Sequence, residues 1–101
     1  MALKKQYLKN KPGCKVTFTL PKEAAKNASE VYVVGDFNEW NTSTMRMKKL
    51  KNGSFTFTTT LERGKEYRFR YLLDGTTWEN DWHADKYVSN EFGGENSVVV
   101  V

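Results

Sequence analysis

Two polar, glycine-containing turns in this 101-residue chain each run directly into a tryptophan. Residues 35–40 read GDFNEW and end at Trp40, and residues 74–78 read DGTTW and end at Trp78. A large aromatic side chain after a turn either folds back onto the core or presents a flat apolar face to a ligand. The C–H face of a sugar ring fits such a platform, provided that a few donors and acceptors stand beside it for the hydroxyls. These residue types therefore suggest carbohydrate recognition.

Two polar side chains are candidates for the hydroxyl contacts. Arg70 lies on the outward face of a predicted strand, shortly before the Asp-Gly pair at 74–75, and its guanidinium offers several donors in a rigid plane. Asn96 follows the Gly-Gly pair at 93–94, and its amide carries both a donor and an acceptor. Together with the two tryptophans, they form a candidate sugar site.

The chain offers little for catalysis or for metal binding. His83 is the only histidine, and no second histidine or cysteine stands near it at metal-ligand spacing. Cys14 has no apparent base beside it. Glycoside hydrolysis requires two carboxyl groups set about a bond in a cleft, whereas the acidic residues here lie mostly at turns. We expect no enzymatic activity, no cofactor and no metal ion.

Alternation of apolar and polar residues with a period of two dominates the chain. Residues 15–20, 54–61 and 66–73 alternate in this way, which predicts half-buried antiparallel strands. Short β-branched runs at 31–34 and 98–101 are typical of strands buried on both faces. Tight-turn pairs such as Asn-Gly, Asp-Gly and Gly-Gly separate these segments. The pattern predicts an all-β fold, an antiparallel β-sandwich.

The length of 101 residues indicates one domain with a modest core. Residues 1–14 do not alternate, so we expect a loosely held N-terminal arm followed by a folded domain over residues 15–101, in which residues 22–26 allow a short helical turn. No apolar run approaches the roughly 18 residues of a membrane span, and no apolar stretch follows the first lysines as in a signal peptide. A single cysteine fits a reducing compartment, so we expect a cytoplasmic protein.

The formal net charge of +4 is unevenly distributed. Residues 1–51 hold eleven Lys or Arg against four Asp or Glu, and residues 52–101 hold five against eight. A basic half can bind nucleic acid, but these lysines are scattered singly with few aromatic residues among them, which favours a solvated surface. Nucleic-acid binding stays a weaker alternative, and a steep salt dependence of affinity would support it.

An ordered set of segments resembles a known family. The segments are VYVVGDFNEW at 31–40, Asn-Gly at 52–53, LERGKEYRFRYLLDG at 61–75, WEND at 78–81 and NSVV at 96–99. In this order they resemble carbohydrate-binding module family 48, which includes the N-terminal domains of isoamylases and branching enzymes and the glycogen-binding domain of the AMP-activated protein kinase β subunit. The resemblance covers about residues 15–101. It implies an immunoglobulin-like, early-set β-sandwich that binds α-1,4-glucans of glycogen or starch type without catalysis.

The resemblance also implies roles for single residues. Trp40 matches the tryptophan that stacks on sugar, and Arg70 matches a basic residue, lysine in the kinase domain, that hydrogen-bonds hydroxyls. Trp78 matches a second platform, with one extra residue in the turn before it. Phe92 stands where a leucine inserts into the ring of a cyclic glucan, and Asn96 matches an asparagine contact.

Other residues depart from the family pattern or receive structural roles. Gly94 stands where the family has a threonine, which removes one hydroxyl contact. Trp82 matches no binding position, and we expect it to pack against the loop after the Asp-Gly turn. Phe37 is expected in the core and Asn38 as a turn-stabilising side chain.

Two functional hypotheses share this predicted fold. The first is a non-catalytic module that binds α-glucan polysaccharide or maltooligosaccharide with a dissociation constant of about 10 μM to 1 mM. The alternative is an accessory domain that docks on a glucan-metabolising enzyme and binds no sugar itself. The two differ at Trp40, Arg70 and Trp78, which should be exposed and convergent in a binder but buried and scattered in a structural domain.

Overall fold

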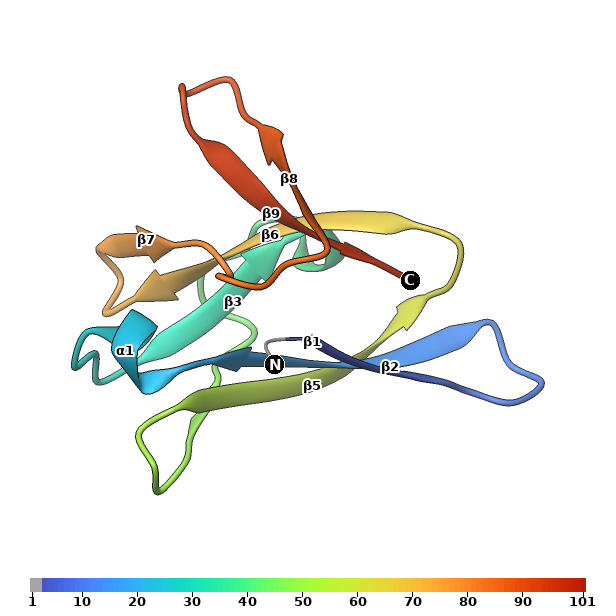
Figure 1. The fold of residues 1–101 in the computed structure, drawn as a ribbon, viewed down its shortest axis with the longest axis horizontal. Helices are drawn as coiled ribbons and strands as arrows, with labels where there is room; N and C mark the ends of the chain where they lie inside the picture. Colours follow the sequence, from blue (N-terminus) through green and yellow to red (C-terminus); the bar gives the residue numbers. More distant parts are fainter. Residues whose placement is uncertain (1–2) are drawn as a thin grey trace.

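Two antiparallel β-sheets pack face to face in the computed structural model, which describes residues 3–101 (Figure 1). We call them sheet A and sheet B. Sheet A has the strand order β1 (Leu3–Tyr7), β2 (Gly13–Leu20), β5 (Phe55–Glu62) and β4 (Lys48–Lys49). Sheet B has the order β3 (Val31–Gly35), β6 (Glu66–Leu73), β9 (Glu95–Val100) and β8 (Lys86–Ser89), with β7 (Thr77–Glu79) also paired to β6. The prediction of an all-β, immunoglobulin-like antiparallel sandwich is confirmed.

The core lies between the two sheets, where the alternating strands turn their apolar faces inward. Phe18 on β2 and Phe69 on β6 are fully buried, and their ring centroids lie 5.0 Å apart in an edge-to-face arrangement. Leu72 differs from the prediction, because it is buried although it points outward. Its cross-strand neighbours Tyr32 on β3 and Trp78 on β7 flank it on that outward face.

The N-terminal segment pairs with the sandwich as an edge strand. β1 runs antiparallel to β2 from the Leu3–Phe18 pair to the Tyr7–Cys14 pair. In addition, Lys5 Nζ lies 2.6 Å from Asp85 Oδ2, which links β1 to the connection before β8 in sheet B. This arrangement differs from the loosely held arm expected for residues 1–14, of which Met1 and Ala2 lie outside the described residues.

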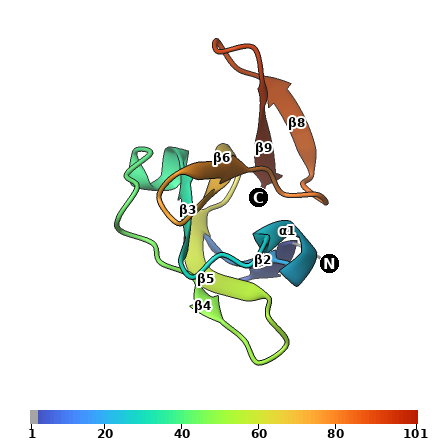
Figure 2. The same cartoon turned by 90° about the vertical axis from the view of Figure 1, so that its left-hand side faces the viewer.

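Short segments close the ends and one edge of the sandwich. The helical turn predicted after β2 is present as α1 (Lys22–Ala25), whose two alanines are buried. At the edge of β3, Val33 N–H donates to Met45 O at 3.0 Å and Met47 N–H donates to Val31 O at 2.8 Å. Because β4 follows at once and joins sheet A, this segment connects the two sheets along one side (Figure 2).

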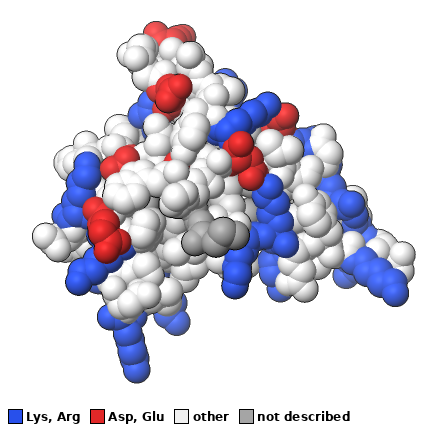
Figure 3. All heavy atoms as spheres, viewed as in Figure 1, with Lys and Arg blue, Asp and Glu red and all other residues white. Residues whose placement is uncertain are grey.

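Charge and shape both distinguish the two sheets. Lys and Arg side chains gather over the part of the molecule that holds sheet A and the β1–β2 hairpin, whereas Asp and Glu lie mainly around sheet B (Figure 3). The hairpin of β8 and β9 projects beyond the sandwich (Figures 1 and 2). No helix in residues 3–101 is long and apolar enough to cross a membrane.

Candidate carbohydrate-binding site

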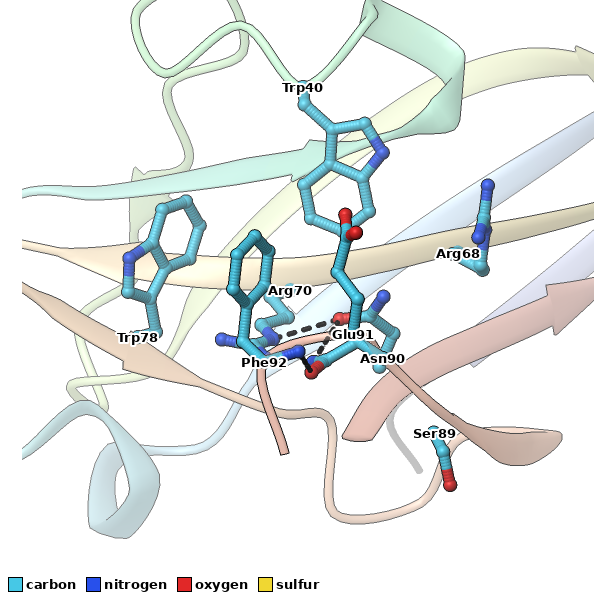
Figure 4. A pocket seen from close by; sticks show the side chains of 9 residues that line it. Trp40, Arg68, Arg70, Trp78, Ser89, Asn90, Glu91 and Phe92 are labelled. Atoms are coloured by element: carbon cyan, nitrogen blue, oxygen red, sulfur yellow. Dashed lines mark hydrogen bonds between the residues drawn. The ribbon is translucent and has the colours of Figure 1, made fainter. Parts of the chain in front are cut away.

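A pocket of about 530 Å³ lies on the outward face of sheet B (Figure 4). It is bounded by the turn after β3, by β6 and β7, and by the loop between β8 and β9. The side chains singled out from the sequence all line it: Trp40, Arg70, Trp78, Phe92 and Asn96. Residues that the sequence reasoning did not single out complete the lining: Arg68, Ser89, Asn90 and Glu91.

Strand register places the central polar and aromatic groups on one face. Because Phe69 and Tyr71 of β6 point into the core, Arg70 between them points outward. Trp78 on β7 pairs with Leu72 and so emerges on the same outward face. The extra residue in the turn before Trp78 does not turn the indole away, because the pairing of β7 with β6 sets its direction.

The turn that carries Trp40 is built from residues 35–40. A Cβ on Gly35 would lie 2.4 Å from the carbonyl oxygen of Arg68, so only glycine allows this close approach of the two strands. Asn38 stabilises the turn as predicted: its Oδ1 accepts from Gly35 N–H at 3.0 Å, and its Nδ2 donates to Val33 O at 3.2 Å. Phe37 packs against the core, also as predicted.

Two consecutive residues of this turn adopt left-handed backbone conformations. Glu39 has φ of 56° and Trp40 has φ of 58°, and neither is glycine. Each such residue costs on the order of 1–3 kcal/mol, and such strain is concentrated at functional sites. The fold therefore bears a local cost that sets the direction of the Trp40 side chain.

Asp36 fixes the indole of Trp40 in the pocket. The indole N–H donates to Asp36 Oδ1 at 2.9 Å, while the backbone N–H and Nε of Arg68 donate to Asp36 Oδ2 at 2.8 Å and 3.2 Å. Partial burial by itself would raise the pKa of the Asp36 carboxyl, but these hydrogen bonds and the nearby guanidinium outweigh burial and lower that pKa below its ordinary value. The indole N–H of Trp40 is thus hydrogen-bonded within the protein, which leaves the ring face for a ligand.

Arg70 connects the second platform to the floor of the pocket. Its guanidinium lies 5.9 Å from the ring centroid of Trp78, whose side chain is exposed. Its Nε donates to Asn96 Oδ1 at 3.0 Å, which leaves the outer guanidinium nitrogens for a ligand. The acceptor of Asn96 is therefore already used, and this residue offers a ligand its Nδ2 donor rather than the donor and acceptor expected from the sequence.

The main chain on both sides of Asn96 is held by Asn80. Asn80 Nδ2 donates to Glu95 O at 3.0 Å, and Asn80 Oδ1 accepts from the backbone N–H of Ser97 at 3.0 Å. The adjacent Asp81 N–H donates to Ser97 Oγ at 2.8 Å within the protein interior. The amide of Asn96 is accordingly presented from a rigid segment of β9.

Phe92 is the most exposed large apolar side chain, at 87%. It lies near the tip of the β8–β9 loop, and in Figure 4 its ring stands over the pocket between Trp78 and Trp40. Gly94 lies close to Arg70, because a Cβ built on it would stand 3.6 Å from Arg70 Nη2. The pocket thus has three aromatic rings around a cluster of hydrogen-bond donors.

Comparison with known families agrees with this arrangement. A family model described as the glycogen recognition site of AMP-activated protein kinase matches residues 15–101, most of the chain. The chain belongs to this family. No curated protein sequence matches it closely enough to count as a relative.

Some residues of this glycogen-recognition module lie outside the pocket. Trp82 does not line it and is 50% exposed, so half of its surface remains in solvent despite the packing expected against the neighbouring loop. Cys14 is fully buried. Within residues 3–101, no group of three or more His, Cys, Asp or Glu side chains lies close enough to hold a metal ion.

The residues missed from the sequence come mainly from the β8–β9 loop of the module. Asn90 stands three residues before the Gly-Gly pair at 93–94, which marks a turn, so its presence in a loop was readable. Its proximity to the tryptophans was not readable, because this short segment carries no signal for the pairing of β8 with β9, which in turn pairs with β6. Glu91 adds a carboxylate to the lining of the pocket.

Proposed function

We propose that this module binds α-1,4-glucans of glycogen or starch type in the pocket on sheet B and catalyses no reaction. One observation carries the proposal: aromatic and polar side chains from distant parts of the chain converge on a single pocket, in which Trp78 and Phe92 are exposed and Trp40 is half-buried. A domain that only kept the family fold would have no reason to leave these aromatic rings in solvent.

The aromatic rings supply the apolar contacts with the sugar. Trp40 and Trp78 would each cover one sugar face, removing on the order of 100 Å² of apolar area and contributing about 2.5 kcal/mol per platform. Phe92 would add a contact from the loop above them. After the cost of association, a dissociation constant of about 10 μM to 1 mM remains, with longer chains preferred.

The polar groups divide the hydroxyl contacts between donors and an acceptor. The outer nitrogens of Arg70 and the Nδ2 of Asn96 would donate to hydroxyl oxygens. Glu91 is the one acidic side chain among the described residues of the pocket, and its carboxylate would accept a hydrogen bond from a hydroxyl group. Glycoside hydrolysis requires a pair of carboxyl groups, so this set is suited to binding rather than to bond cleavage.

In this function the module would tether itself, or an enzyme joined to it, to a glycogen-like polymer. Its expected partners are an α-glucan or maltooligosaccharide and, in the second place, a glucan-metabolising enzyme. A cytoplasmic location stays a prediction from the single cysteine.

A heteronuclear NMR titration with maltoheptaose and β-cyclodextrin tests the proposal. Saturable shifts are expected for the indole N–H signals of Trp40 and Trp78, whereas Trp82, outside the pocket, serves as the internal control. The absence of any shift at millimolar sugar would contradict glucan binding and favour the accessory-domain alternative. An oligonucleotide titration at several salt concentrations tests the nucleic-acid alternative, which requires a steep loss of affinity with salt.

A further inference from the structure

The side chain of Asn90 lies inside the loop that carries Phe92. Its Oδ1 accepts from the backbone N–H of Phe92 at 2.9 Å and from that of Gly94 at 3.0 Å. The backbone N–H of Asn90 also donates to Gly94 O at 2.9 Å, which closes the loop at its base. One carboxamide therefore satisfies two inward-pointing amides of this short connection.

The same carboxamide links the loop to the floor of the pocket. Since Oδ1 of Asn90 is used by two backbone donors, its Nδ2 is directed to the Oδ1 of Asn96, at 3.4 Å. That oxygen also accepts from Arg70 Nε at 3.0 Å. The resulting chain of hydrogen bonds runs from the loop to the guanidinium beneath it (Figure 4).

Phe92 has few contacts of its own that could hold it in place. Its side chain is 87% exposed, and the two residues after it are glycines, of which Gly93 has φ of 83°. Glycines widen the range of backbone conformations open to a loop. A ring on a free loop must lose this freedom when it contacts a ligand, and that loss weakens binding.

We infer that Asn90 is a positioning residue for glucan binding: it fixes the loop so that the ring of Phe92 stands over the pocket before the sugar arrives. The inference rests on the proposed function. Asn90 affects affinity through the position of Phe92, because a ring held over the pocket contributes more to sugar binding than a ring on a free loop.

The test begins with Asn90→Ala, which removes the oxygen that accepts from both amides of the loop. We expect binding of β-cyclodextrin, followed by isothermal titration calorimetry or NMR, to weaken about tenfold, equivalent to about 1.4 kcal/mol. Asn90→Asp keeps an oxygen acceptor for both amides but loses the long Nδ2 contact with Asn96, so it should recover most, though not all, of the affinity that Asn90→Ala loses. In Asn90→Ala the amide protons of Phe92 and Gly94 should also exchange faster with solvent.

The chain offers a matched control in sheet A. Asn52 accepts from the backbone N–H of Ser54 at 3.0 Å in the turn between β4 and β5, and so stabilises a turn in a similar way far from the pocket. Asn52→Ala should leave the affinity for β-cyclodextrin unchanged. A loss equal to that of Asn90→Ala would show a general effect on the fold and overturn the inference.

A double-mutant cycle separates positioning from a merely structural role. In a Phe92→Ala background, Asn90→Ala should cause no further loss of affinity, because the ring that it positions is gone. Fully additive losses, or unchanged affinity in the Asn90→Ala single variant, would overturn the inference while the proposed function stands. Absence of binding by the unmodified chain would instead remove the proposed function, and this inference with it.

Discussion

The outward faces of the two sheets are built from the same alternating pattern but present different surfaces. On sheet A, short polar side chains face the solvent, as in the cross-strand pair of Thr17 and Thr58, whose hydroxyls lie 2.9 Å apart. On sheet B, Val34 and Val98 point outward beside their cross-strand neighbours Arg70 and Arg68, yet both are buried. Only the second face carries a pocket with aromatic rings.

The difference shows that the turn after β3, the short strand β7 and the β8–β9 loop add aromatic rings to the polar face of sheet B. Trp40 follows a strained turn and Phe92 lies in the β8–β9 loop, whereas the strands beneath them contribute Arg70 and Asn96. A rigid sheet fixes the polar groups, and loops bring large rings beside them. The outward face of sheet A also carries a depression, but its lining holds no aromatic ring: Lys4, Lys5, Gln6, Lys15 and Thr17.

The largest expected effect is the loss of a ring from sheet B. Trp40→Ala should weaken glucan binding by about 2.5 kcal/mol, roughly 60-fold, because it removes one sugar platform. Thr58→Ala, at a solvent-facing position of sheet A, should leave the affinity unchanged. Isothermal titration calorimetry with maltoheptaose measures both variants, and equal effects would remove the functional distinction between the faces.

Removal of a positively charged side chain should show the same contrast between the two sheets, with a smaller loss of affinity. Arg70→Ala should weaken binding about tenfold, because it removes hydroxyl donors and also the hydrogen bond that orders Asn96. Lys15→Ala, a cation on the outward face of sheet A, is the matched control and should have no effect. A comparable loss from Lys15→Ala would mean that overall positive charge, rather than the pocket, governs affinity.

Acidification should weaken the hydrogen bond to Asp36 that holds the indole of Trp40 in place. The folded-state pKa of Asp36 is lowered, so the stability that its carboxylate contributes is present above the ordinary aspartate pKa and is lost as pH falls through the folded value. As pH falls through the folded-state pKa, which lies below the ordinary aspartate value, affinity should fall about fivefold because the charged hydrogen bond to the indole weakens. The Trp40 indole N–H signal should shift in parallel. Asp36→Asn should abolish this pH dependence, and its persistence in that variant would assign it to another group.

The smallest expected effect is a gain in glucan affinity, from a substitution at Gly94. Gly94 is not in a left-handed conformation, and a Cβ there would meet Asn90 Nδ2 at 3.5 Å and Arg70 Nη2 at 3.6 Å, both ordinary contacts. Gly94→Thr should therefore be tolerated and tighten glucan binding about two- to threefold through a new hydroxyl contact. Gly94→Val has the same shape without the hydroxyl, and an equal gain from it would show that apolar packing is responsible.

Strong periodicity made the larger strands predictable. Alternation over β2, β5 and β6 identified these strands and most of their inward-facing residues, because burial of one face demands a period of two. The short strands β1, β4, β7 and β8 had no such signal. They form because a longer neighbour offers hydrogen bonds along its edge, which is a property of the assembled sheet.

The sequence by itself determined the fold class, the family and the candidate site residues, since all of these follow from residue type and order. Only the tertiary structure decided which donor and acceptor atoms of those residues remain available to a ligand. The Oδ1 of Asn96 accepts from Arg70, and the indole N–H of Trp40 donates to Asp36. Asn90 belongs to the site because its side chain accepts a hydrogen bond from the loop that carries Phe92. Hydrogen bonds between residues distant in sequence depend on strand register and on loop conformation, and both are fixed only when the sheets pack together.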